Sequence, residues 1–203
     1  PMDHVLGSEH AKNLDAALDA QFARCAADAA CAKALPDARA TLAAVRAALA
    51  EPDRAPVVYR DPTTGERREE VPTFGHLGIV LRLYSYAPLT ATLLPVVLQQ
   101  AADGDWAPLL AQSRFLMGSV GDAIMHGMQL SVMCAEDADE MAVDPADDAT
   151  VMGSQFVGWL KAQCEVWPRG QRPADFRAPL TGDLPVLAIS GEFDPVTPPR
   201  YAD

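Results

Sequence analysis

Helical spacing of apolar residues, with little strand pattern, dominates the first 125 residues and constrains the fold more than any other feature. A turn signal at Pro36-Asp37 separates two such stretches. One strand pattern lies at 57–71, where Asp-Pro-Thr-Thr-Gly at 61–65 suits the turn of a small hairpin. Without alternating strands and helices this region cannot form a doubly wound sheet, so we expect a helical cap. The apolar residues at helical spacing include Leu14, Leu18, Phe22, Cys25, Leu42, Val45 and Leu49.

The sequence changes character in its last third. Residues 128–133 fit either a short strand or the tail of a helix, because their periodicity does not decide between the two. An acidic stretch follows, beginning at Cys134. Residues 185–190 belong to a nearly all-apolar run bounded by turn residues, which is typical of a buried parallel strand. We therefore expect two parts, a mostly helical cap at 1–130 and a segment at 131–203 that returns to an α/β core.

Acidic residues outnumber basic residues in this chain. With 28 Asp and Glu against 16 Lys and Arg, the formal net charge is −12. Such a chain is repelled by a nucleic-acid duplex and by an anionic membrane surface, so we expect neither as a partner. No apolar run approaches the roughly 18 residues that a membrane span needs. The sequence opens without a signal peptide, on Pro1-Met2-Asp3-His4, which we interpret as a cut or engineered start.

Four cysteines fall into two sets along the chain, Cys25 with Cys31 and Cys134 with Cys164. They permit three pairings, and the sequence alone does not choose between these, although the short spacing of the first set favours a bond within it. We expect two disulfides and an oxidising compartment; buried free thiols in a cytosolic protein are the alternative. The four histidines are scattered, and no spacing fits a zinc site, so we expect no metal.

A string rich in glycine and proline follows the expected strand at 185–190. It reads Ser-Gly-Glu-Phe-Asp-Pro-Val-Thr-Pro-Pro-Arg-Tyr at 190–201. Gly191 lets the chain turn sharply at the carboxyl end of the strand, where open α/β sheets bind their ligands. Asp194 would project from a loop stiffened by prolines, which suits a carboxylate that holds an imidazole in one tautomer. By itself, an aspartate after a strand is more typical of a solvated loop.

The whole string resembles the segment that carries the triad aspartate in α/β-hydrolases of the tripeptidyl aminopeptidase and proline iminopeptidase type. The resemblance covers nearly the whole chain, and its specificity lies in the combination of strings. It implies an α/β-hydrolase fold in which residues 1–130 are the lid and a strand at 185–190 leads to Asp194. The strings that look like the family's lid and post-lid region are the Cys25/Cys31 segment, the hairpin turn at 61–65, Gly-Asp-Trp-Ala-Pro-Leu-Leu at 104–110, Cys-Ala-Glu-Asp at 134–137 and Cys-Glu-Val-Trp-Pro at 164–168.

The resemblance implies a secreted, periplasmic or cell-envelope serine hydrolase. Such an enzyme releases short peptides or single residues from a free N-terminus through an acyl-enzyme. Asp194 would be the triad acid, Thr197 would support its loop, and Cys134 would pair with Cys164. A peptide would be the substrate, and no metal or organic cofactor is implied. The alternatives are an esterase that acts on a small ester with the same fold, or a lid or interaction module without catalysis.

The serine and the histidine of the triad are absent from the expected places. The family order is Ser, Asp, His, with the serine on a Gly-x-Ser-x-Gly elbow. No serine of the chain has that context, and all four histidines precede Asp194. We therefore expect a piece of a hydrolase, from the lid to the triad aspartate, with the remaining core supplying the other two residues. The 203-residue chain alone should be inactive.

Glu136 and Asp137 lie where relatives of this type use lid carboxylates to hold the α-amino group of the substrate. An aminopeptidase needs a carboxylate there because a buried ammonium must be paired. The alternative is that the two residues simply begin a solvated acidic loop. Calcium binding between Asp137 and Asp148 is a further hypothesis, although the spacing does not match an EF-hand loop.

Overall fold

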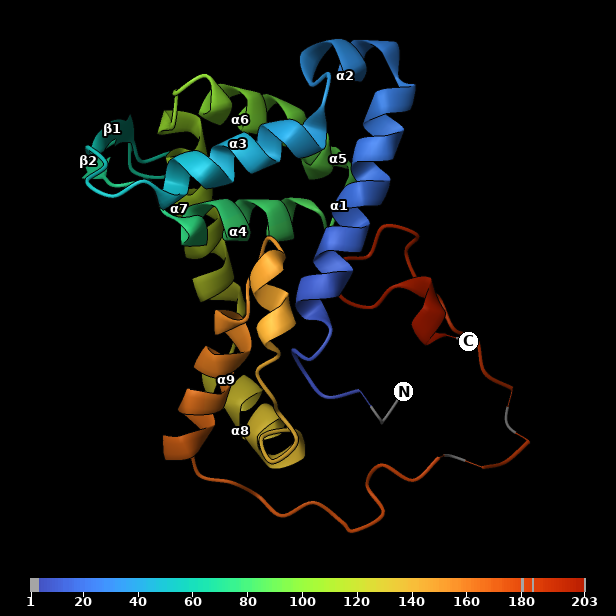
Figure 1. The fold of residues 1–203 in the computed structure, drawn as a ribbon. Helices are drawn as coiled ribbons and strands as arrows, with labels where there is room; N and C mark the ends of the chain where they lie inside the picture. Colours follow the sequence, from blue (N-terminus) through green and yellow to red (C-terminus); the bar gives the residue numbers. More distant parts are fainter. Residues whose placement is uncertain (1–3, 180, 184, 203) are drawn as a thin grey trace. The chain divides into compact units, whose positions relative to one another are not determined.

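The computed structural model describes residues 4–179, 181–183 and 185–202 (Figure 1). The chain clusters into two compact units. We call Ala17–Ala123 the helical unit, and the described residues of Pro1–Ala16 and Ile124–Asp203 the terminal unit. Helix α1 (His10–Ala27) contributes to both. The start of the chain clusters with its last third, and the expected division of the chain at 130 stays a prediction. The role of the cap as a lid stays a prediction.

Apolar helix faces build the core of the helical unit. α3 packs against α6, and α4 packs against α7. Val45 on α3 is fully buried, as its helical spacing predicts, and so are Leu81 on α4 and Leu110 on α7. Besides the second half of α1, the helices of this unit are α2 (Ala29–Ala34), α3 (Ala38–Ala50), α4 (Phe74–Tyr84), α5 (Pro88–Ala91), α6 (Leu94–Ala102) and α7 (Ala107–Ala123).

Polar side chains fix where several of these helices begin. Asp28 accepts hydrogen bonds from N–H groups in the first turn of α2, and Asp37 does the same for α3. Thr73 and His76 form a reciprocal capping box at the start of α4. Each cap satisfies N–H groups that the helix itself leaves without a partner.

The hairpin expected at 57–71 is present. β1 (Val57–Arg60) pairs antiparallel with β2 (Arg67–Glu70). Asp61 accepts hydrogen bonds from two N–H groups of the turn, and Gly65 closes the turn with a φ of +73°. These two strands form the only sheet among the described residues.

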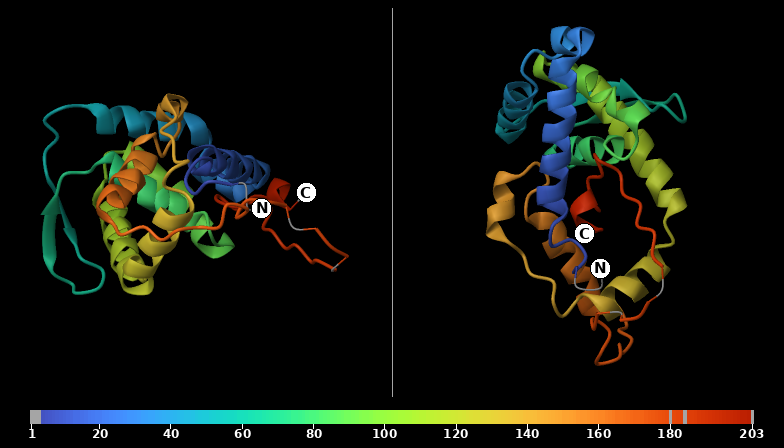
Figure 2. Two further views of the ribbon diagram at one scale, coloured as in Figure 1. Left: turned by 90° about the horizontal axis from the view of Figure 1, so that it is seen from below. Right: turned by 90° about the vertical axis from the view of Figure 1, so that its right-hand side faces the viewer.

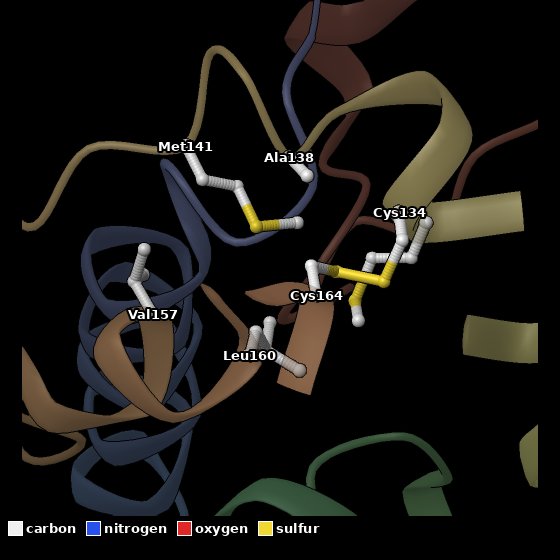
Figure 3. Close-up of a cluster of buried hydrophobic side chains, with 7 residues drawn as sticks. Cys134, Ala138, Met141, Val157, Leu160 and Cys164 are labelled. Atoms are coloured by element: carbon white, nitrogen blue, oxygen red, sulfur yellow. A yellow bond between two sulfur atoms is a disulfide. The ribbon is translucent and has the colours of Figure 1, made fainter. Parts of the chain in front are cut away.

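A core centred on a disulfide holds the terminal unit together (Figure 3). Cys134 on α8 (His126–Glu136) is bonded to Cys164 on α9 (Gln155–Val166). Val5 and Leu6 pack against the same cluster, which explains why the residues before α1 belong to this unit. The other buried side chains of the cluster are Met133, Ala138, Met141, Val157 and Leu160. The unit also contains the 3₁₀ helices η1 (Pro145–Ala149) and η2 (Pro199–Tyr201).

A second disulfide joins Cys25 to Cys31 at the turn from α1 into α2. Both pairings are those favoured above, the first because of its short spacing and the second because of the resemblance. Among the described residues, no helix has the length and the apolar character that crossing a membrane requires.

The segment at 185–190 does not form the expected strand. Val186, Leu187 and Ile189 leave 83% to 87% of their surface exposed. A strand is held by hydrogen bonds to a neighbouring strand, and the described residues provide no neighbour for this one. Leu184, the first residue of the apolar run, lies outside the described residues. The core sheet of an α/β-hydrolase is therefore not confirmed in this chain, which runs from α9 to η2 without helix or strand over its described residues (Figures 1 and 2).

Residues 128–133 are helical, so the strand alternative for them is wrong. The helix continues through Cys134 to Glu136, because its inward side chains complete the apolar cluster around the disulfide. The acidic loop therefore begins later than expected, at Asp137, whose N–H caps the helix by donating to the carbonyl of Met133.

One oxygen of a buried carboxylate in the terminal unit lacks a hydrogen bond. Asp147 on η1 is 1% exposed, and its Oδ1 has no hydrogen-bond partner among the described residues. The Nζ of Lys12 lies 3.9 Å from that oxygen, but it lies 2.9 Å from Asp144. Burial raises the pKa of Asp147; Lys12 opposes this rise, and the carboxylates of Asp144, Asp148 and Glu9 add to it.

Replacement of Cys134 and Cys164 by alanine should lower the free energy of unfolding of the terminal unit by about 3.7 kcal/mol, since the bond spans 30 residues of the unfolded chain. Removal of the Cys25–Cys31 bond, which spans six residues, should lower that of the helical unit by about 2.4 kcal/mol. Urea denaturation of both double variants shows which disulfide contributes more to the free energy of unfolding. A larger loss for the shorter loop would contradict the chain-entropy explanation.

Asp147→Asn should stabilise the terminal unit at neutral pH by about 1 kcal/mol, the low end for an unpaired buried polar group, because Lys12 already compensates part of the charge. A carboxyl whose pKa is raised by folding disfavours the folded state only above the ordinary carboxyl range. The gain should therefore vanish in acid. Asp144→Asn is the matched control, because the pKa of Asp144 is lowered by its hydrogen bond from Lys12. Asp144→Asn should destabilise the unit at neutral pH. Urea denaturation at several pH values measures the change in the free energy of unfolding for both variants, which should be opposite in sign at neutral pH.

Candidate functional site

The loop at 190–198 is folded around the carboxylate of Asp194. Its Oδ1 accepts hydrogen bonds from the backbone N–H groups of Val196 and Thr197, both at 2.8 Å. Its Oδ2 accepts one from the hydroxyl of Thr197 at 2.9 Å. The N–H of Asp194 donates to the carbonyl of Gly191 at 3.1 Å. The side chain thus supplies the acceptor that the backbone of this loop needs.

The residues around Asp194 explain why the loop adopts this conformation. Pro195 is buried, its ring restricts φ, and it has no N–H of its own. The first N–H groups that follow the aspartate are therefore those of Val196 and Thr197, and both reach its carboxylate. The hydroxyl of Ser190 donates to the carbonyl of Thr197 at 2.7 Å and joins the two ends of the loop.

These contacts set the protonation state of Asp194. Desolvation by burial raises the pKa of this carboxyl, but the hydrogen bonds from Thr197 and Val196 outweigh it and hold the pKa below its ordinary value. The carboxylate is therefore ionised at neutral pH. It contributes stability above the ordinary carboxyl range, and this contribution is lost as the pH falls through the lowered pKa.

The amino-terminal turn of α1 holds this loop from the other side. The Nδ2 of Asn13 donates to the carbonyl of Val196 and to the hydroxyl of Tyr201, both at 2.9 Å. Arg200 donates to Glu9 at 3.0 Å and also to the side-chain oxygen of Asn13. The sequence patterns do not identify these residues, although one signal is present, since Asn13 is a polar residue among the apolar positions of a helix.

Glu136 and Asp137 differ in their environment although they are adjacent. Asp137 accepts a hydrogen bond from Nη2 of Arg177 at 2.9 Å, and its side chain is 13% exposed. The carboxylate of Glu136 is half-buried and has no hydrogen bond or ion pair among the described residues. The backbone carbonyl of Glu136, by contrast, accepts hydrogen bonds from both Arg172 and Arg177.

Two arginines tie the chain after α9 to the end of α8. Arg172 reaches Asp139 at 3.0 Å and Glu140 at 2.6 Å, and Arg177 reaches Glu140 at 2.8 Å. The hydrogen bond from Arg177 is the main cause that lowers the pKa of Glu140. Cations at this position also face the negative end of the α8 dipole, which is favourable. The acidic stretch is therefore partly neutralised rather than simply solvated.

The described residues contain no group of three or more His, Cys, Asp or Glu placed to hold a metal ion. Three of the carboxylates considered for calcium are engaged elsewhere. Asp137 pairs with Arg177, Asp144 pairs with Lys12, and Asp148 accepts from the N–H of Ser154 at 3.2 Å. Nothing in this part of the chain therefore favours the calcium hypothesis.

Asp194 and Thr197 are brought together, whereas Glu136 and Asp137 make no hydrogen bond or ion pair with them. Within the described part of the chain, no histidine donates to the carboxylate of Asp194, and the hydrogen bonds to it come from its own loop. The site within this chain is therefore one ionised carboxylate on a braced loop.

The region that contains this loop is similar to a known protein family. Residues 149–203 match an α/β-hydrolase family model described as TAP-like protein. The match supports a TAP-like α/β-hydrolase region in this part of the chain and, with it, a hydrolase in general. No curated protein and no solved structure matches the chain.

Proposed function

We propose that this chain is part of a secreted serine hydrolase in which Asp194 is the acidic residue of the catalytic triad. The enzyme removes short peptides or single residues from a free N-terminus through an acyl-enzyme. The family match of residues 149–203 supports a hydrolase, and the braced, ionised Asp194 within that match carries the assignment of the triad acid.

The pattern of hydrogen bonds at Asp194 suits a triad acid. A carboxylate offers about four acceptor positions. Oδ1 is filled by two N–H groups, whereas Oδ2 accepts a hydrogen bond only from the hydroxyl of Thr197 among the described residues. One position therefore stays open on Oδ2 for the Nδ1–H of a histidine. An ionised carboxylate held in this way fixes the tautomer of the imidazole and stabilises the imidazolium.

The nucleophile and the base come from polypeptide outside these 203 residues. No serine of the chain lies on a Gly-x-Ser-x-Gly elbow, and no histidine follows Asp194. In the same complete protein the apolar residues 185–190, exposed in this chain, pair with strands of the core sheet, and the helical unit forms the lid.

Glu136 is the better candidate of the two acidic residues for binding the amino group of the substrate. Asp137 already has a cationic partner in Arg177, whereas the half-buried carboxylate of Glu136 has none among the described residues. Glu136 also lies at the carboxyl end of α8, where the helix dipole disfavours a negative charge and favours a cation. An ammonium ligand would satisfy both the carboxylate and the helix end.

Secretion is supported by the chemistry of the cysteines. The structure contains two disulfides, and such bonds persist in oxidising compartments. The Cys134–Cys164 bond fixes the end of α8 against α9, and so contributes to the placement of Glu136.

In the protein that contains this chain together with its serine and histidine, Asp194→Asn should lower kcat on the order of 10⁴-fold. Glu192→Gln is the control, because Glu192 is exposed, lies two residues away and has no partner in the loop. Turnover of a tripeptidyl chromogenic substrate measures both. Loss of turnover in Glu192→Gln alone would show that the motif is misaligned. A fluorophosphonate label on a serine of the isolated 203-residue chain would refute the proposal.

Glu136→Gln should raise KM for substrates with a free amino terminus by about 10- to 100-fold, because a hydrogen bond to a charged group contributes about 1.5–3 kcal/mol. The same change should leave N-blocked substrates unaffected. Asp137→Asn is the control, since it weakens the contact with Arg177 and should not discriminate between the two substrates. Equal turnover of free and blocked substrates by the unmodified enzyme would favour an esterase.

A further inference from the structure

We propose that Asn13 is a positioning residue for Asp194: from α1 it fixes the peptide unit between Val196 and Thr197 that holds the carboxylate of Asp194 in place. The inference rests on the proposed function for its catalytic meaning, but the contact itself belongs to this chain. Nothing in the sequence pattern around Asp194 identifies this residue, because it lies 183 positions away from Val196.

The burial of Asn13 calls for an explanation. Its side chain is 2% exposed on a helix whose neighbouring inward residues, such as Leu14 and Leu18, are apolar. Burying an amide costs free energy unless its groups are hydrogen-bonded. All the partners of this side chain lie between Val196 and Tyr201. The residue is therefore placed to bind this segment rather than to fill the core.

The geometry of one peptide unit transmits the contact to Asp194. The carbonyl of Val196 and the N–H of Thr197 belong to the same planar unit, so an interaction that fixes one end also fixes the other. Asn13 donates to that carbonyl at 2.9 Å, and the N–H at the other end donates to Oδ1 of Asp194 at 2.8 Å. Asn13 thus acts on the carboxylate without touching it.

A second set of contacts holds the far end of the same segment. Glu9 lies one helical turn before Asn13 and accepts hydrogen bonds from Arg200 at 3.0 Å and from the hydroxyl of Tyr201 at 3.3 Å. The hydrogen bond from Arg200 is the main cause that lowers the pKa of Glu9, with burial opposing it. These residues anchor η2, whereas Asn13 also reaches back to the turn around Asp194.

The chemistry of the side chain explains why an asparagine stands here. The site requires donors for Val196 and Tyr201 and an acceptor for Arg200, and an amide supplies both. An aspartate has the same shape and could still pair with Arg200, but it cannot donate to the carbonyl. This difference provides a variant that removes the proposed contact and preserves the packing.

The test measures the isolated 203-residue chain by NMR, so that it does not depend on turnover. The two readouts are the pKa of Asp194, from titration of its carboxyl carbon, and the hydrogen exchange of the Thr197 amide. In both Asn13→Ala and Asn13→Asp, exchange at Thr197 should be faster by about tenfold, the effect of losing one hydrogen bond. The pKa of Asp194 should rise toward that of an exposed aspartate.

Controls separate this effect from a general loss of structure. Lys12→Gln changes the adjacent residue on α1, which contacts Asp144 instead, and should alter neither readout. Amides of α9 should keep their protection in every variant. If Asn13→Ala unfolds the unit, the two readouts in the isosteric variant Asn13→Asp test the proposal. Unchanged titration of Asp194 and unchanged exchange at Thr197 in Asn13→Asp would overturn the proposal.

A kinetic readout in the complete enzyme links the contact to catalysis. Asn13→Asp should lower kcat about tenfold with KM nearly unchanged, because it disturbs the position of the triad acid and not substrate binding. The two possible failures are distinguishable. If Asp194→Asn leaves turnover intact, the triad assignment fails, but the titration of Asp194 in the Asn13 variants still tests the contact. If those variants titrate as the unmodified chain does, the contact fails and the triad assignment is unaffected.

Discussion

Every backbone N–H and C=O group needs a hydrogen-bond partner, and this requirement decides which parts of the chain are ordered by themselves. The helices meet it internally, and the strands β1 and β2 meet it along one shared edge. Residues 185–190 have the composition of a buried strand but no neighbouring strand among the described residues, and they form no strand and are exposed. The loop at 190–198 meets the requirement in a third way, through the carboxylate of Asp194.

That third solution gives Asp194 a structural task besides the catalytic one that we propose. The two N–H groups on Oδ1 order the loop, while the open position on Oδ2 is available for an imidazole. An asparagine oxygen could still accept from both N–H groups, and the hydroxyl of Thr197 could reverse its direction to accept from the amide. The loop can thus survive the loss of charge, so an isosteric change at this residue separates its structural task from the proposed catalytic one.

Local signals in the sequence predict most of the helices, the hairpin and the turn chemistry of the Asp194 loop. Helical spacing of Leu42, Val45 and Leu49 gives α3, and the Asp-Pro-Thr-Thr-Gly string gives the turn at 61–65, because each depends on neighbours a few residues away. Contacts between distant residues were not predictable. The contact of Asn13 with Val196 spans 183 residues, and its only local sign is a polar residue on an apolar helix face.

The adjacent carboxylates of Glu136 and Asp137 show the same limit for electrostatics. In the sequence they are equivalent members of an acidic stretch, and a net charge of −12 indicates only that many carboxylates lack a cation in their vicinity. Packing distinguishes them, because the chain after α9 brings Arg177 to Asp137.

Arg172 and Arg177 also donate to the backbone carbonyl of Glu136, yet neither pairs with its carboxylate. The arginines thus compensate the negative end of α8 while one carboxylate beside it keeps its capacity to bind a cation. Under the proposed function, a substrate ammonium placed there would meet a carboxylate that has no partner among the described residues, on a helix end fixed by a disulfide. Its position would then be set by the fold rather than by a mobile acidic loop.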